Sequence, residues 1–157
     1  MSEFSHLNDG FPSMVDVGAK PTTHRMAVAR GRITLPEEVT SRWHQEEIHV
    51  AKGPVFQTAI LAGTMAAKKT ADLIPLCHPL ALHRIDISIT LFELDAVVEA
   101  TVGCDGKTGV EMEALTAVSV ALLTIYDMCK AFTHDMRISD IELMQKEGGK
   151  SDYNAHG

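Results

Sequence analysis

HRIDISITLFEL, residues 83–94, is the stretch that decides the fold class of this chain. Its apolar side chains alternate with polar ones, the apolar set being Ile85, Ile87, Ile89 and Leu91. A period of two predicts a β-strand with one buried and one exposed face. The next run, AVVEATVGC at 96–104, predicts a second strand that pairs with the first across a short turn at Leu94-Asp95. We therefore expect an antiparallel hairpin here.

Upstream of this hairpin the sequence predicts one strand and two helices. The strand spans about residues 23–35, and Pro36 suits the first turn of a short helix through EEVTSRWHQEE, residues 37–47. Gly53-Pro54 opens a longer helix, whose apolar residues recur at steps of three and four until Pro75 excludes further helix. Small residues on this helix predict that another backbone approaches it closely: Ala59, Ala62, Gly63, Ala66 and Ala67.

Downstream of the hairpin the sequence predicts a long helix at about 109–132 and a last strand at about 136–144. The core-facing seam of the helix consists of Leu115, Val118, Leu122, Ile125 and Cys129. When the two earlier helices are counted as one crossover, the order of elements is β-α-β-β-α-β. That order predicts an α+β, ferredoxin-like fold, an antiparallel sheet with helices packed on one face.

The chain length of 157 residues predicts a single domain spanning 1–157, large enough for a core without metal or disulfide support. Residues 1–20 are rich in Gly, Pro, Ser and Asn and predict an extended arm. The tail KEGGKSDYNAHG is expected to be flexible over residues 147–157 unless a ligand or partner orders it.

Composition narrows the classes of function. The net charge of −7 argues against nucleic-acid or membrane-surface binding, so an anionic ligand must find a local group of lysines. No segment approaches about 18 uninterrupted apolar residues, and the N-terminus does not resemble a signal peptide. The three cysteines, Cys77, Cys104 and Cys129, form no metal-binding or disulfide pattern. We therefore expect a cytoplasmic protein.

GCDGKTGVEMEAL, residues 103–115, invites comparison with a phosphate-binding P-loop. That loop requires a glycine five positions before Gly106, where this chain has Thr101, so the comparison fails. Thr108 and Glu111 have the spacing of a capping box, which favours a structural role for Glu111. Met112 and Glu113 lack such an explanation and remain candidates for function.

Asp127 and Lys130 lie three residues apart near the end of the long helix. They form either a surface ion pair or part of a site. Glu113 precedes Asp127 by 14 residues, which is roughly 21 Å along a helix. Within one chain the two carboxylates cannot contact the same reacting atom. They serve opposite ends of a long substrate, or a site combines Glu113 of one subunit with Asp127 of another, which is the arrangement we prefer.

LIPLCHPL, residues 73–80, is a loop stiffened by Pro75 and Pro79. His78 in this loop can bind phosphate or transfer a proton, although the loop alone could account for its order. A Cys77–His78 nucleophile pair is disfavoured because adjacent side chains in extended backbone point to opposite sides. A metal site is also disfavoured, because no spacing that suggests ligation relates His24, His44, His49 and His134.

Four runs resemble one known family: MVDVGAK, KGPVFQTAILAGTMAAKKTADLIPLCHPL, GKTGVEMEALTAVSVALLTIYDMCKA and EGGKS. The chain is similar over about residues 5–151 to molybdenum cofactor biosynthesis protein C, the cyclic pyranopterin monophosphate synthase family. The resemblance implies a lyase that converts (8S)-3′,8-cyclo-7,8-dihydroguanosine 5′-triphosphate into cyclic pyranopterin monophosphate and releases diphosphate. It also implies a ferredoxin-like fold and a homohexamer, a trimer of dimers with sites at the dimer interface.

The resemblance also implies roles for particular residues. The catalytic positions it marks are Asp127, Lys130 and Lys52. The substrate-binding positions it marks are Leu76, Cys77, His78, Met112, Glu113, Lys68, Arg25 and Lys146. It implies no required cofactor and no protein-held metal, while Mg²⁺ could accompany the triphosphate.

The chain departs from the family pattern at three positions. Pro54 stands where an acid is usual, Ile60 where an arginine is frequent and Asp152 where a glycine is usual. These departures concern phosphate contacts and the tail rather than the catalytic runs. Two alternatives remain open at this point, a non-catalytic ferredoxin-like binding module and an enzyme acting on another phosphorylated pterin or nucleotide.

Overall fold

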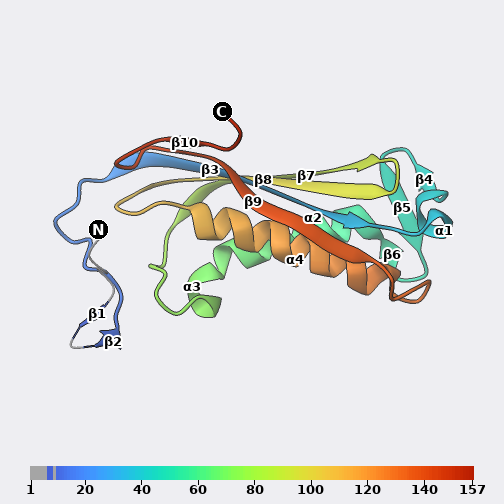
Figure 1. Cartoon of the computed structure of the whole chain (residues 1–157), viewed down its shortest axis with the longest axis horizontal. Helices are drawn as coiled ribbons and strands as arrows, with labels where there is room; N and C mark the ends of the chain where they lie inside the picture. The colour runs from blue at the N-terminus through green and yellow to red at the C-terminus, as the bar shows by residue number, and fades with distance from the viewer. Residues whose placement is uncertain (1–6, 9) are drawn as a thin grey trace.

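The computed structural model describes residues 7, 8 and 10–157, and its main feature is a five-stranded antiparallel sheet (Figure 1). The order across the sheet is β10-β9-β3-β8-β7, and every neighbouring pair is antiparallel. The bounds are Thr23–Thr34 for β3, Leu82–Phe92 for β7, Asp95–Gly106 for β8, Arg137–Glu147 for β9 and Tyr153–Asn154 for β10. The predicted α+β class with an antiparallel sheet is confirmed.

The predicted hairpin is formed by β7 and β8, with Ile87 opposite Ala100. The turn between them is Glu93-Leu94 rather than Leu94-Asp95, because Asp95 already pairs with Phe92 and Glu93 has a positive φ of 53°. Alternate residues of β8 are almost completely buried: Ala96, Val98, Ala100, Val102 and Cys104. The period of two in the sequence therefore identified the strands and placed the turn one residue too late.

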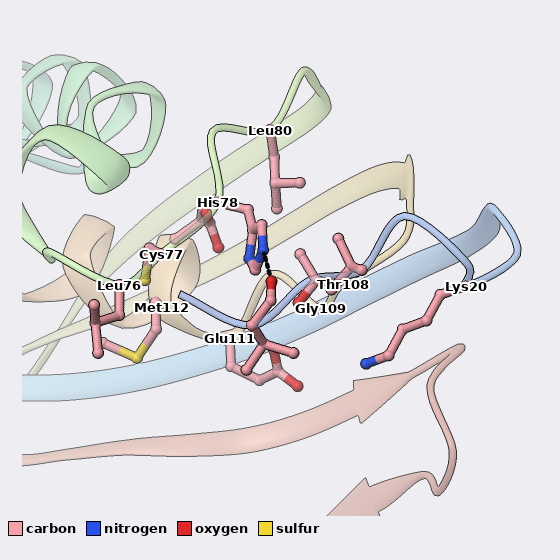
Figure 2. A pocket seen from close by; sticks show the side chains of 12 residues that line it. Lys20, Leu76, Cys77, His78, Leu80, Thr108, Gly109, Glu111 and Met112 are labelled. Atoms are coloured by element: carbon pink, nitrogen blue, oxygen red, sulfur yellow. Dashed lines mark hydrogen bonds between the residues drawn. The ribbon is translucent and has the colours of Figure 1, made fainter. Parts of the chain in front are cut away.

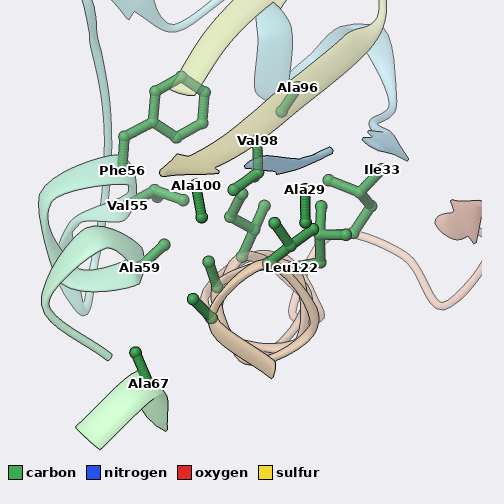
Figure 3. Close-up of a cluster of buried hydrophobic side chains, with 14 of the residues drawn as sticks. Ala29, Ile33, Val55, Phe56, Ala59, Ala67, Ala96, Val98, Ala100 and Leu122 are labelled. Carbon is green, nitrogen blue, oxygen red and sulfur yellow. The ribbon is translucent and has the colours of Figure 1, made fainter. Parts of the chain in front are cut away.

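Two long helices, α2 (Val55–Lys68) and α4 (Glu111–Cys129), cover one face of the sheet (Figure 1). The short helix α3 (Thr70–Leu73) follows α2. Small strand residues let α4 lie close to the sheet (Figure 3). A Cβ on Gly31 of β3 would lie 2.8 Å from Leu122 Cδ1, so α4 leaves no room for a side chain there.

The predicted close approach at α2 occurs at Gly63, where a Cβ would lie 2.8 Å from the backbone oxygen of Ala117. Ala59, Ala66 and Ala67 on the same helix are also buried. The neighbouring backbone is that of α4 in the same chain. This small-residue face is therefore occupied within the chain and gives no support to packing between subunits.

By length and composition, α4 could span a membrane, with a mean hydropathy of 1.4 over its most apolar window. Here it packs against the sheet and beside α2, and the predicted seam residues Val118, Leu122, Ile125 and Cys129 are fully buried. Its apolar residues are those of a core helix, since 56% of that window is buried.

The predicted helix over residues 37–47 is mostly absent. Only α1 (Glu37–Thr40) is helical, and β4 (Trp43–His44), β5 (Glu47–Val50) and β6 (Gly53–Pro54) follow as a small antiparallel sheet. The carboxylate of Glu47 explains the difference. It is buried and accepts the backbone N–H groups of Ile48, Phe56 and Gln57 at 2.7, 2.8 and 3.0 Å, so it caps the start of α2.

The two ends of the chain form short strands. In the arm, β1 (Leu7–Asn8) pairs with β2 (Phe11–Pro12), and in the tail β10 pairs with β9. A turn at Gly148, with φ of 92°, leads into the tail and leaves no room for a Cβ beside the backbone of His24. The flexibility that we expect of residues 147–157 stays a prediction.

Candidate functional site

A cavity of about 260 Å³ lies at the N-terminal end of α4 (Figure 2). The arm, the loop after α3 and the first turn of α4 form its walls. Its lining includes five predicted site residues, Leu76, Cys77, His78, Met112 and Glu113. The fold thus brings together two runs that lie far apart in the sequence, PLCHP at residues 75–79 and VEME at residues 110–113.

His78 is held by the arm. Its Nε2 lies 2.6 Å from the backbone oxygen of Val15, the contact drawn as a dashed line in Figure 2. Because a carbonyl oxygen only accepts hydrogen bonds, Nε2 carries the proton. The Nδ1 atom of a neutral imidazole is then left as an acceptor. The arm therefore fixes both the position and the tautomer of the ring.

Glu113 lines the same cavity and is only 4% exposed. Burial raises the pKa of its carboxyl group, and the nearby charge of Glu111 raises it further. Burial and the Glu113 carboxylate likewise raise the pKa of the Cys77 thiol. A thiol with a raised pKa is a poor nucleophile, which agrees with our decision against a Cys77–His78 pair.

A second cavity, of about 460 Å³, adjoins the first and shares Lys20, Thr108, Gly109 and Glu111 with it. Four cationic residues line this second cavity: Lys20, Arg25, Lys146 and Lys150. Lys146 Nζ lies 3.2 Å from Glu111 Oε1. Several cations beside a cavity make a suitable site for phosphate groups.

The predicted capping box of Thr108 and Glu111 is absent. Val110 precedes the first helical residue, Glu111, and among the described residues no side-chain hydrogen bond caps this end of the helix. Glu111 is therefore too early in the helix to be the third residue of a capping box, and it pairs with Lys146 instead. It belongs to the cavity wall.

At the other end of α4, Asp127 lies between two lysines. Its carboxylate oxygens are 3.2 Å from Lys52 Nζ and 3.0 Å from Lys130 Nζ, and all three side chains are about half exposed. Lys52 Nζ also donates to the backbone oxygen of Asp127 at 2.9 Å. The hydrogen bonds from Lys130 and then Lys52 lower the pKa of Asp127, so its carboxylate is ionised at neutral pH.

The predicted residues thus form two groups at opposite ends of one helix. Arg25 and Lys146 adjoin the His78–Glu113 group, whereas Lys52, Asp127 and Lys130 form the other. Lys68 is exposed in the last turn of α2 and lines neither of the two cavities described above. One chain does not bring Glu113 and Asp127 to a common point, as the spacing on the helix predicted.

The sequence analysis missed Lys20 and Val15, which line the first cavity from the arm. Both lie in the run MVDVGAK, residues 14–20, in which no site residue was predicted. Asp152, one of the departures, has its Oδ1 3.3 Å from the backbone nitrogen of Gly148, beside the second cavity.

A model described as the MoaC family matches residues 14–149, which include Val15, the whole first cavity, the second cavity except Lys150, and the Asp127 cluster. The chain belongs to the MoaC family. The family predicted from the sequence motifs is thereby confirmed, and the matched segment contains every predicted site residue of this MoaC chain.

Curated relatives resemble this MoaC chain over almost its whole length. A cyclic pyranopterin monophosphate synthase of Heliobacterium modesticaldum is 54% identical over 154 residues, 96% of each chain. One of Lysinibacillus sphaericus is 50% identical and covers 99% of each chain. Molybdenum cofactor biosynthesis protein 1 of Drosophila melanogaster is 50% identical over 97% of this chain and 27% of its own length.

Proposed function

We propose that this protein is a cyclic pyranopterin monophosphate synthase of molybdenum cofactor biosynthesis. It converts (8S)-3′,8-cyclo-7,8-dihydroguanosine 5′-triphosphate into cyclic pyranopterin monophosphate and releases diphosphate. The observation that carries the proposal is identity of about half of all residues, over nearly the full chain, to proteins of that name. The rivals considered from the sequence, a binding module and a different enzyme, have no such support.

The cationic second cavity is the proposed phosphate site. Closing a cyclic phosphate and expelling diphosphate concentrates negative charge on the departing group, and cations stabilise that charge. Lys20, Arg25, Lys146 and Lys150 are positioned for this role. The ring system then occupies the adjoining cavity, beside His78 and Glu113.

Ring opening and ring closure require proton transfer. We assign it to His78, whose tautomer is fixed, and to the cluster of Asp127, Lys130 and Lys52. Glu113, with its raised pKa, retains its proton to a higher pH than an exposed glutamate does. A carboxylic acid of that kind can donate a hydrogen bond to the substrate.

A complete site requires two subunits in this proposal. The Glu113 end of α4 from one chain and the Asp127 end from another face the same substrate, within the homohexamer that the family resemblance implies. The finer description of the fold as ferredoxin-like is supported by the order β9-β3-β8-β7, which brings the first and third long strands together at the centre.

The reaction needs no protein-held cofactor in this scheme, because the groups that line the second cavity suit phosphate oxygens directly. Any Mg²⁺ enters on the triphosphate. We also propose a cytoplasmic location, which suits three cysteines that are all free.

The test is incubation of the protein with the cyclised nucleotide, followed by detection of diphosphate and of the pterin product. Asp127→Asn and Lys130→Ala should each abolish product formation while the far-ultraviolet circular dichroism stays unchanged, because both side chains are exposed. Near-wild-type turnover by either variant would contradict the assignment of the Asp127 cluster to catalysis.

A further inference from the structure

On the sheet face opposite the helices, three potential metal ligands meet at one end of the sheet. His24 of β3 lies directly opposite Asp105 of β8, and His83 lies on the neighbouring strand β7. His83 falls at an irregularity in pairing, between Leu82 opposite Cys104 and Arg84 opposite Gly103. A bulge of this kind redirects a side chain, and here it brings the His83 ring beside His24. We call these three residues the outer-face triad.

The donor atoms of the outer-face triad are close together. His24 Nδ1 is 3.0 Å from Asp105 Oδ1, and His83 Nε2 is 3.6 Å from the same oxygen. All the donor atoms lie within 4.8 Å of one another. Tetrahedral coordination at about 2.0–2.2 Å places donor atoms roughly 3.3 Å apart, so small side-chain rotations suffice to bind one ion.

The surroundings also suit a cation. The two imidazole rings stack with centroids 5.3 Å apart and an angle of 12°. Gly103 provides space for this stack, since a Cβ there would press on His83 Cε1 at 3.2 Å. The Asp105 carboxylate, within 3.6 Å of a nitrogen of each ring, supplies an oxygen ligand.

We propose that the outer-face triad binds one divalent transition-metal ion of the Zn²⁺ type, through two imidazoles and one carboxylate. Water fills the remaining coordination positions. Imidazole nitrogen favours Zn²⁺, Ni²⁺ or Cu²⁺ over Mg²⁺, which prefers oxygen ligands. The ligands of the proposed site therefore differ from the phosphate oxygens that would hold any Mg²⁺ arriving with a triphosphate.

Binding of the ion would connect the ends of three strands. Neighbouring residues on a strand point to opposite faces, so Arg25 and Cys104 lie next to ligands while facing the helix side. Arg25 lines the cationic cavity. An ion on the outer face would thus fix the strand ends that carry part of the proposed phosphate site.

The test is isothermal titration of the full-length protein with Zn²⁺ alone, with Mg²⁺ as a separate titrant. We expect one Zn²⁺ per chain, no comparable Mg²⁺ binding and a melting temperature that rises with Zn²⁺ concentration. His83→Ala and Asp105→Asn should each weaken Zn²⁺ binding by at least about tenfold. His44→Ala, which removes an exposed imidazole from β4, is the matched control and should bind as the wild type does.

The spectrum of bound Co²⁺ identifies the ligand type, and nitrogen and oxygen ligation without a thiolate band is expected. Wild-type affinity in either His83→Ala or Asp105→Asn would overturn the proposal, as would thiolate ligation or equal loss of binding in His44→Ala. Because the side chains of His83 and Asp105 are 42% and 65% exposed, the two variants should fold, and either one alone suffices for the comparison.

Discussion

Two inactive variants of this protein should recover activity when they assemble together. Glu113→Ala removes the buried hydrogen-bond donor at the N-terminal end of α4, and Asp127→Asn removes the carboxylate at the other end. The two positions are separated by roughly 21 Å along the helix axis. Each variant alone lacks one part of every site, so each should be inactive.

The expected recovery follows from the pairing of chains. In a 1:1 mixture with random assembly, half of the α4 helices keep the wild-type residue at their N-terminal end, and the other half keep it at their C-terminal end. A site that takes one end from each of two chains is complete in about a quarter of cases, which predicts about a quarter of wild-type turnover. A site built within one chain is never complete, and predicts none.

The assay is release of diphosphate from the cyclised nucleotide by complexes purified through two different affinity tags. The matched control pairs Asp127→Asn with Lys52→Ala. In the wild-type protein these two side chains lie 3.2 Å apart within one chain. No site in that mixture contains both intact groups, so it should stay inactive. Absence of recovery in the first mixture, equal recovery in both mixtures, or full activity of Glu113→Ala alone would refute the reasoning.

Three further predictions concern stability and can be measured by urea unfolding. Glu47→Ala should destabilise the protein by about 1–3 kcal/mol, since it leaves buried backbone N–H groups at the start of α2 without their acceptor; a stability unchanged from wild type would contradict the capping role. Gly63→Ala should cost about 1–2 kcal/mol, because the added Cβ collides with the Ala117 carbonyl and this outweighs the helix preference of alanine; an unchanged or increased stability would show that α2 and α4 are less closely packed. The raised pKa of Glu113 means that the folded state binds its proton more tightly than the unfolded state, so stability should fall as pH rises from the ordinary value of 4.5 through the raised one. Glu113→Gln should remove this loss of stability with rising pH. An identical dependence of stability on pH in the two proteins would contradict the raised pKa of Glu113.

Local patterns in the sequence predicted the long elements correctly. Strand β7 was found because its burial alternates with a period of two, and α4 because its seam recurs every three or four residues. Both signals come from neighbours within the same element. The helix predicted through Glu47 failed for the opposite reason, since the role of that carboxylate depends on Phe56 and Gln57, nine and ten residues further along.

The same limit applies to the candidate site, where contacts between residues far apart in the sequence were not predicted. The motif runs indicated His78, Glu113 and the Asp127 cluster as site residues, which stays a prediction, and the spacing along one helix correctly separated the last two. Val15 was missed because it holds His78 through its backbone oxygen, across 63 residues, and a backbone contact leaves no trace in side-chain chemistry. Lys20 was missed because only the folded arm places it between the two cavities.

The length of α4 has a consequence for the candidate site as well as for packing. A helix that begins at Glu111 and ends at Cys129 sets both the distance and the angle between its two functional ends. One residue inserted in its middle would rotate Asp127 relative to Glu113 by roughly 100° and shift it by about 1.5 Å. In the proposed two-subunit site, each α4 contributes to two neighbouring sites. A change in its residue count would then disable both sites at once, even if every functional side chain were retained.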